Sequence, residues 1–128
     1  MVTAITEGVK VSVEANYQNG FSNPGQHHYV FTYKVTIENH SNFTLQLLKR
    51  RWEVYDAASD LKIIEGEGVV GQQPVLEPGA THAYISGCNL RSGMGKMTGQ
   101  YTMEKQVDGK LLMVAIPEFQ LIANIFDN

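Results

Sequence analysis

The chain has 128 residues, of which 43% are hydrophobic and 18% are charged, so it predicts one globular domain over residues 1–128 and excludes wholesale disorder. Ten Lys and Arg residues oppose 13 Asp and Glu residues, for a net charge of −3. A mildly acidic chain is a poor partner for nucleic acid or an anionic membrane, because both are negatively charged and bind basic surfaces.

Hydrophobic residues recur at every second position along most of the chain, which is typical of strands with one buried face. The alternation is clearest over residues 31–38, where Phe, Tyr, Val and Ile alternate with Thr, Lys and Glu. The predicted strands are residues 9–15, 31–38, 44–55, 61–65, 80–86, 96–107 and 110–116.

The predicted strand over residues 44–55 carries an arginine on an otherwise apolar face. Leu48, Trp52 and Val54 share this face with Arg50, because side chains two positions apart point the same way on a strand. We therefore expect Trp52 in the core. We expect Arg50 to be partly buried, with a carboxylate or the backbone as its partner.

Turn-forming residues separate the strands, and Asp108-Gly109 in particular predicts a type I′ hairpin. Residues 56–61 have room for one short helical turn, and no window predicts a long helix. The apolar tail, residues 118–128, is either a last strand or an edge that pairs with a second copy of the chain. Several short strands with regular turns predict an all-β fold, and the long antiparallel alternation favours an immunoglobulin or fibronectin type III-like β-sandwich of two antiparallel sheets.

The chain carries no signal for export or membrane insertion. Its single Cys88 excludes an internal disulfide, and no stretch approaches the about 20 apolar residues of a membrane span. Residues 1–10 lack a basic region followed by an apolar run. We therefore expect a cytoplasmic protein.

Gly66, Gly68 and Gly71 have the spacing G-x-G-x-x-G, which in dinucleotide sites lets backbone N–H groups approach a pyrophosphate. The helix that should follow is missing, and Glu65 and Glu67 would repel phosphate. The favoured interpretation is therefore glycines that permit bulges and tight backbone packing. An anion site stays open as the alternative, and it requires the basic run over residues 49–51 to fold nearby.

The basic run, Lys49-Arg50-Arg51, is the only one in the chain. On a strand, Lys49 and Arg51 point to one face and Arg50 to the other. The favoured interpretation is a structural ion pair together with solvated charges. Contact with a ligand or a partner is the alternative.

No catalytic or metal-binding constellation is predicted, so we expect a protein that is not an enzyme and has no cofactor. Cys88 has no nearby base, since His82 lies six residues upstream on the same predicted strand, and it is interpreted as a small buried apolar residue. His27-His28 diverge on an extended chain, and the spacings of metal ligands are absent.

Several segments together resemble the ApaG family, and the resemblance covers about residues 3–123. Its most specific part is the block over residues 66–79, GEGVVGQQPVLEPG. Further matching segments are residues 29–33, 37–39, 51–52, 56–57, 84–90, 95–103 and 116–121.

The resemblance implies a fibronectin type III-like sandwich, in agreement with the strand pattern. It also implies a family link to cobalt resistance and magnesium efflux under the name CorD, and a suggested role of the glycine block in binding pyrophosphate. Related domains in eukaryotic proteins look like protein-interaction modules. The resemblance supplies no catalytic residues.

Two functions follow as hypotheses. The first is a non-enzymatic module that binds another protein or a second copy of itself. The second is a sensor of a nucleotide polyphosphate, a pyrophosphate or a divalent cation. Both use the same candidate residues, which are Gly66, Gly68, Gly71, Gln72, Arg50 and Arg51.

Overall fold

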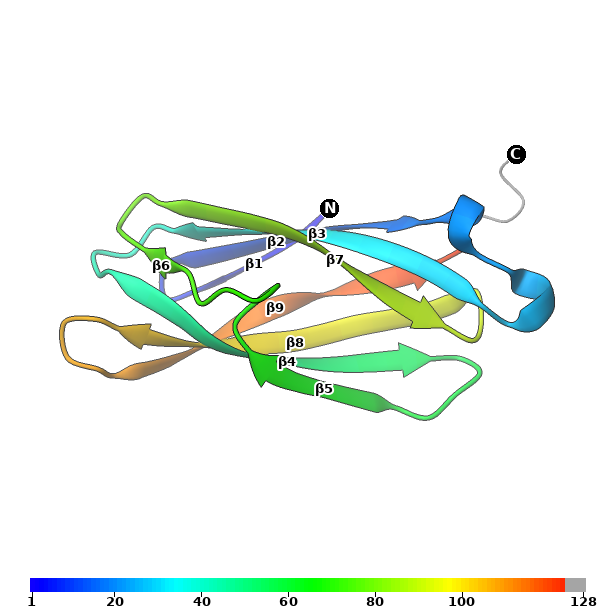
Figure 1. Cartoon of the computed structure of the whole chain (residues 1–128). Coiled ribbons are helices and arrows are strands. Elements are labelled where there is room, and N and C mark those ends of the chain that lie inside the picture. Colours follow the sequence, from blue (N-terminus) through cyan, green and yellow to red (C-terminus); the bar gives the residue numbers. More distant parts are fainter. Residues whose placement is uncertain (124–128) are drawn as a thin grey trace.

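Two antiparallel sheets pack face to face in the computed structural model, which describes residues 1–123 (Figure 1). The first sheet has the order β1 (Val2–Thr6), β2 (Val9–Tyr17), β3 (Tyr29–Asn39), β7 (Thr81–Leu90). The second has the order β5 (Lys62–Glu67), β4 (Leu45–Asp56), β8 (Met94–Lys105), β9 (Leu111–Ile122), and the short β6 (Val75–Leu76) also pairs with β4. Two single 3₁₀ turns, η1 (Asn19–Phe21) and η2 (Pro24–Gln26), connect β2 to β3. The predicted all-β sandwich is confirmed.

Every strand predicted from the alternation is present, with ends that shift by a few residues. The strand β1 is absent from the predicted set because it is short and mostly exposed, so its alternation is weak. The tail forms a strand as far as Ile122, which is the end of β9. The structure describes residues 1–123, so the part of this expectation that concerns residues 124–128 lies outside the described residues.

The expected apolar face of β4 needs one correction. A β-bulge lies between Leu47 and Lys49, so Leu48 has no partner on β8. The bulge shifts the alternation by one residue, and Leu47 rather than Leu48 is fully buried. Beyond the bulge, Trp52 and Val54 lie in the core as predicted.

The hairpin between β8 and β9 exists, but the predicted type I′ turn at Asp108-Gly109 is wrong. A type I′ turn requires positive φ at both central residues, and here only Gly109 has it. The backbone N–H of Lys105 donates to the carbonyl of Lys110, so the loop is longer than two residues.

The segment after β4 forms a hydrogen-bonded turn instead of the expected helical turn. The carboxylate of Asp56 accepts hydrogen bonds from the backbone of Ala58 at 3.1 Å and of Arg91 at 2.7 Å, and from the hydroxyl of Ser92 at 2.7 Å. Burial alone would raise the pKa of Asp56, but these hydrogen bonds outweigh it and lower the pKa. Asp56 therefore ties the β4–β5 turn to the β7–β8 turn.

An aromatic cluster joins the two sheets. Tyr33 of β3 contacts Trp52 of β4 and Phe119 of β9, with ring centroids 5.4 Å and 5.6 Å away. Trp52 and Phe119 meet edge to face at 5.9 Å. Aromatic pairs in this geometry contribute about 0.5–1.5 kcal/mol beyond their buried area.

The sandwich is closed along one side and open along the other. On the closed side β1 meets β9, and the backbone N–H of Ala115 donates to the hydroxyl of Thr6 at 3.1 Å. On the open side β7 pairs only with β3 and β5 only with β4, so within residues 1–123 each has one free edge. Among these residues no helix has the length and apolar character to cross a membrane.

Candidate functional site

The loop from Gly68 to Gln73 folds between the free edges of β5 and β7, on the open side of the sandwich (Figure 1). The bulge on β4 holds it there. The carbonyl of Leu48 accepts hydrogen bonds from the backbone N–H of Gly68 at 2.8 Å and from the side chain of Gln73 at 2.9 Å. Because the bulge removes Leu48 from the ladder with β8, its carbonyl is available to the loop.

The tip of this loop is a type I′ turn with Val70 and Gly71 at its centre. Val69 and Gln72 exchange two backbone hydrogen bonds, at 2.8 and 3.0 Å. Val70 has a φ of 47° and Gly71 a φ of 75°. Positive φ suits glycine but is a genuine outlier for a β-branched residue, and it costs of order 1–3 kcal/mol.

The two valines at the tip have opposite roles. The side chain of Val69 is buried in the core between the sheets, so it plugs the open side. The side chain of Val70 is 62% exposed, although its backbone is strained. Ile85 of β7 is 64% exposed and lines the same cleft as Val70. Two aliphatic side chains from distant parts of the chain thus converge at the surface.

The glycines of the block have structural roles, as the favoured interpretation predicts. A β-carbon at Gly68 would lie 2.1 Å from the carbonyl oxygen of Gln72, and its φ is +62°. The N–H groups of Gly68, Val69 and Gln72 already donate within the protein. Three of the backbone N–H groups that could bind a phosphate are therefore already hydrogen-bonded to carbonyl groups of the protein.

Arg50 lies beside the glycine block, on the inner face of β4. Its Nη1 donates to the carbonyls of Glu67 at 2.9 Å and Gly68 at 3.0 Å. A β-carbon at Gly66 would lie 2.8 Å from both terminal nitrogens of Arg50. The predicted backbone partner of Arg50 is confirmed, and Gly66 provides the space for the guanidinium.

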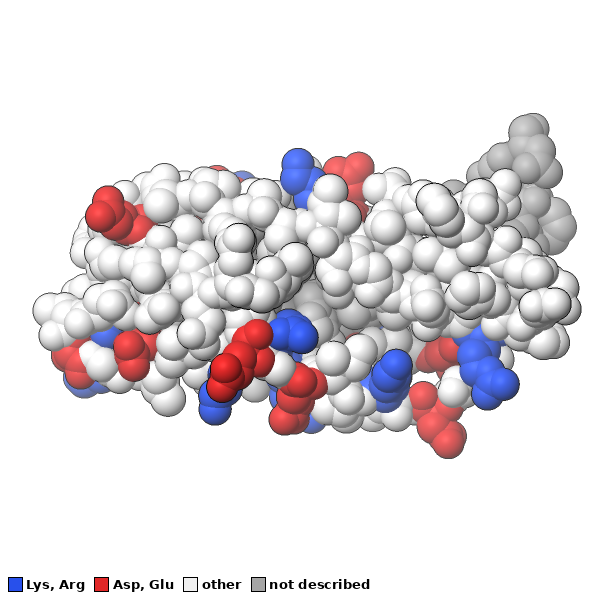
Figure 2. Space-filling view, in the orientation of Figure 1, with Lys and Arg blue, Asp and Glu red and all other residues white. Residues whose placement is uncertain are grey.

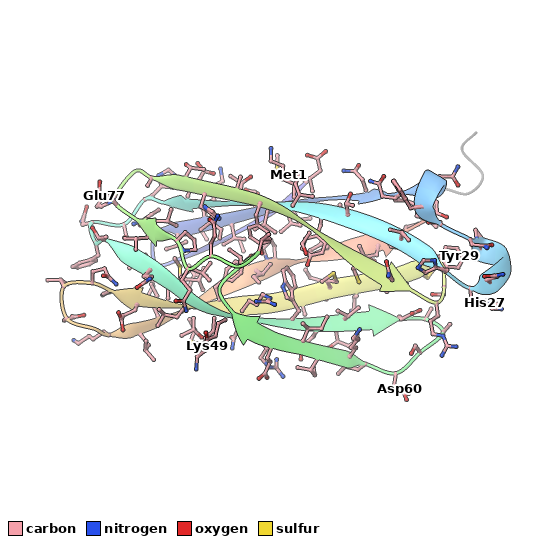
Figure 3. The ribbon with its side chains drawn as sticks, in the orientation of Figure 1. Met1, His27, Tyr29, Lys49, Asp60 and Glu77 are labelled. Atoms are coloured by element: carbon pink, nitrogen blue, oxygen red, sulfur yellow. The ribbon has the colours of Figure 1, made fainter. Side chains whose placement is uncertain are left out.

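Lys49 and Arg51 lie on the outer face of β4, as expected for alternate strand positions. Lys49 points away from the other sheet (Figure 3). The register of β5 places Glu67 opposite Lys49 and Glu65 opposite Arg51. The Nε of Arg51 lies 3.3 Å from the carboxylate of Glu65, and its Nη1 lies 3.5 Å from that of Glu53. The basic run thus lies close to the glycine block, but two of its members face glutamates across the sheet.

Three tyrosines lie beneath the loop, between the sheets. The hydroxyls of Tyr84 and Tyr101 hydrogen-bond to each other, and Tyr33 lies beside Ser86. Burial raises the pKa of all three tyrosines, and the charge of Arg50 partly opposes that rise.

The remaining candidates show no catalytic arrangement within residues 1–123. Burial raises the pKa of the Cys88 thiol to about 11, so the thiolate is scarce at neutral pH. His82 lies on the same strand as Cys88. No group of three His, Cys, Asp or Glu side chains in the described part of the chain could hold a metal ion.

Five of the six candidate residues, Gly66, Gly68, Gly71, Gln72 and Arg50, lie within the loop or next to it. The sixth, Arg51, lies on the outer face of β4 against Glu53 and Glu65. Sequence reasoning missed Val70, Ile85 and Tyr84. For Val70 no turn signal exists, because a β-branched residue before glycine is not among the pairs that favour a type I′ turn. For Ile85 and Tyr84 only the sheet order reveals the proximity.

Comparisons with known proteins agree on one family. The ApaG domain family matches residues 19–105. Protein ApaG of Brucella suis is 44% identical over 121 residues, covering 94% of this chain and 92% of that protein. Protein ApaG of Brucella anthropi is also 44% identical over 121 residues, with the same coverage. The crystal structure of an ApaA protein from Bordetella pertussis has a TM-score of 0.87 at 38% identity, covering 91% of this chain and 94% of that chain. The chain belongs to the ApaG family.

Proposed function

We propose that this protein is a non-enzymatic binding module that recognises another protein through the open side of the sandwich. The observation that carries the proposal is Val70. An exposed aliphatic side chain at a strained turn position brings no stability, and strain of this kind concentrates at functional sites. Ile85 adds a second exposed aliphatic group at the same cleft. Such convergence favours protein contact.

The strand edges on this side support the proposal. Among residues 1–123, no strand pairs with the outer edges of β5 and β7, which leaves backbone N–H and C=O groups available there. An extended segment of a partner can add to such an edge as a further strand. The strand β7 also carries no Lys, Arg, Asp or Glu from Thr81 to Leu90, and the surface over it shows none of these residues (Figure 2). An uncharged edge does not repel an added strand.

The chemistry of the described side chains supports a non-enzymatic role. A nucleophilic cysteine requires a lowered pKa, whereas that of Cys88 is raised to about 11. The three buried tyrosines hold their protons more tightly than ordinary tyrosines, which makes them poor general bases.

The experiment is site-specific photo-crosslinking in host cells. A photoreactive amino acid is placed at Val70 and, separately, at Ile85. The matched controls are Val107 and Leu111, which are 74% and 63% exposed but lie at the β8–β9 hairpin. We expect Val70 and Ile85 to capture the same protein, which is identified by mass spectrometry. The partner is then purified and its binding measured directly.

Two results would contradict the proposal. One is crosslinking that is equally strong from the control positions, which would indicate random collisions. The other is an identified partner that binds the Ile85→Lys variant as tightly as the unchanged protein. A second copy of the chain is recognised in the same experiment by the mass of the product.

A second candidate is a sensor of pyrophosphate-containing ligands or divalent cations. The observation that favours it is the position of Arg50, Lys49 and Arg51 beside the glycine block, as this function requires. Titration with pyrophosphate or Mg²⁺, monitored by backbone-amide NMR, tests it. Saturable shifts over residues 66–72 that disappear in Arg51→Glu would support the sensor.

A further inference from the structure

A cleft opens between the two sheets, beneath the tip of the loop. It has a volume of about 290 Å³ and meets a neighbouring hollow of about 410 Å³ along the same side. The two share Tyr33, Ile64 and Gly87. Figure 2 shows the hollow at the middle of this face, between the two layers. Together they have the dimensions of a site for a small organic molecule.

The walls of the cleft combine apolar surface with a few polar groups. Around Arg50 it is lined by Tyr33, Trp52, Ile64, Val69, Tyr84 and Ser86. Trp52 and Val69 belong to the buried core, so this part of the wall is rigid. The residues with polar side-chain groups in this lining are Arg50, Ser86, Tyr33 and Tyr84. This composition is typical of ligand sites.

The guanidinium of Arg50 is fixed in place but keeps unused donors. Nη1 is held by the carbonyls of Glu67 and Gly68, and the absence of a side chain at Gly66 leaves the space that the guanidinium occupies. A guanidinium has five N–H donors. The donors of Nη2 and Nε have no hydrogen-bond partner among residues 1–123. Because its position is already set, little side-chain entropy is lost when an anion binds.

The charge of the cleft has one sign. Arg50 and Lys62 are its charged residues, and no Asp or Glu among the described residues lines either part. Arg51 differs, because it lies against Glu53 and Glu65 on the outer face. Within the cleft, no carboxylate of residues 1–123 opposes the attraction between Arg50 and an anion; Glu65 and Glu67 lie with Arg50 around a separate hollow on the outer face. Apolar walls also strengthen that attraction, because they exclude water.

We propose that this cleft binds a small carboxylate with an apolar body, and that Arg50 holds the carboxylate through its Nη2 and Nε donors. A planar guanidinium and a carboxylate match in two parallel hydrogen bonds. The apolar body of the ligand packs against Ile64 and Tyr84, which line the cleft and are only partly buried. A bare inorganic anion would leave this wall without contacts, and a polyphosphate would carry more charge than Arg50 and Lys62 neutralise.

The inference does not rest on the proposed protein partner. A ligand in the cleft is detected with the purified protein alone, whereas the partner is detected by crosslinking from the rim. Either can fail while the other holds. The loss of Val70, for example, removes an aliphatic group from the rim but leaves Arg50 and its two carbonyl partners unchanged.

The test is an NMR titration of the purified protein with 3-phenylpropionate. We expect saturable shifts of the Arg50 side-chain N–H signal and of the backbone amides of Gly66, Ser86 and Gly87. The neutral isostere 3-phenylpropanamide is expected to bind at least tenfold more weakly. The Arg50→Lys variant keeps the charge but loses the planar fork, and it should also weaken binding at least tenfold. Lys49→Gln, which removes a cation from the outer face, should leave the affinity unchanged.

Four outcomes would overturn the inference. The first is equal binding of the amide and the carboxylate. The second is a set of shifts at Lys49 and Thr102, which would place the anion on the outer face. The third is preferential binding of pyrophosphate or inorganic phosphate. The fourth is binding of a peptide with a free C-terminus when no small carboxylate binds. Thermal unfolding of each variant separates lost binding from lost folding.

Discussion

The guanidinium of Arg50 lies directly over the α-carbon of Gly66. The two residues are partners across the β4–β5 ladder, and a β-carbon at position 66 would lie 2.8 Å from both terminal nitrogens of the arginine. Gly66 is therefore needed for the space that it leaves, since its φ is not positive. The first glycine of the block thus positions an arginine.

A Gly66→Ala substitution is expected to displace the guanidinium of Arg50. The flexible side chain moves away, so the fold survives, but the two hydrogen bonds to the carbonyls of Glu67 and Gly68 are lost. We expect a loss of about 1 kcal/mol in the free energy of unfolding, measured with denaturant. Gly20→Ala is the control, because nothing lies within 4 Å of an added β-carbon there. An unchanged Arg50 side-chain NMR signal in Gly66→Ala would refute this account.

A Val70→Asn substitution should stabilise the protein. Asparagine tolerates positive φ and is preferred before glycine in type I′ turns, so it relieves the strain at the loop tip. The free energy of unfolding should rise by about 1 kcal/mol. Val107→Asn, at another exposed valine, should change stability by less than about 0.5 kcal/mol. If Val70→Asn were neutral, the positive φ of Val70 would carry no strain.

Gly68 and Gly71 should differ in how strongly a substitution lowers the free energy of unfolding. At Gly68 an added β-carbon meets the carbonyl oxygen of Gln72 at 2.1 Å, whereas at Gly71 nothing lies within 4 Å. Both have positive φ. Gly71→Ala should therefore cost about 1 kcal/mol, from φ alone. Gly68→Ala should cost at least twice as much, because the backbone must move. Equal losses in chemical denaturation would contradict the close approach.

Asn39 is expected to be the most sensitive polar residue of the core. It is 0% exposed, and its side chain donates to the carbonyls of Phe43 and Leu76 and accepts from Ser41. An Asn39→Ala substitution leaves these buried groups without partners and should cost about 3 kcal/mol or more. Asn42→Ala, at an exposed position of the same loop, should change stability by less than about 0.5 kcal/mol. Similar losses in the two variants would be inconsistent with this role of Asn39.

Stability should fall steeply above about pH 10, the ordinary pKa of tyrosine. Burial raises the pKa values of Tyr84 and Tyr101 in the folded state, so the folded protein keeps protons that the unfolded chain releases. This contribution to stability is complete below the pKa that the tyrosines have in the unfolded chain. It is lost as the pH rises toward the higher pKa values that they have in the folded protein. Tyr101→Phe should reduce the slope of unfolding free energy against pH by about 1.4 kcal/mol per unit. The same slope in the variant would exclude Tyr101 as its source.

Much of the fold could be predicted because most strands have one buried face, and the residues of that face are hydrophobic and occur at alternate positions of the sequence. The alternation over Tyr29–Asn39 is clear because one face is buried in the core and the other is mostly only partly buried. The type I′ turn was expected at Asp108-Gly109 and is found at Val70-Gly71. Turn type depends on the register of the flanking strands as well as on local preference, and tertiary packing of Val69 outweighs that preference here.

The candidate site was predicted in part. Arg50 was expected to be partly buried, with either a carboxylate or the backbone as its partner, because it shares a strand face with Trp52; the structure provides backbone partners. The bulge at Leu48 was not expected, since alternation signals report the face of a side chain but not an inserted residue. That bulge frees the carbonyl that holds Gly68 and Gln73. The position of the loop therefore depends on a feature that no local pattern reveals.

The sequence by itself determined the class of the fold, most of the strands, the burial of Trp52 and the family. These depend on period-two hydrophobicity and on contiguous motifs, which are local properties of the chain. Only the tertiary structure decided which edges are free, and that Val70 and Ile85 line the same cleft between them. It also decided that Arg50 keeps unused donors beside an apolar wall. The reason is that these relationships join residues on different sheets, and the order in which strands pair is set by packing of the whole core.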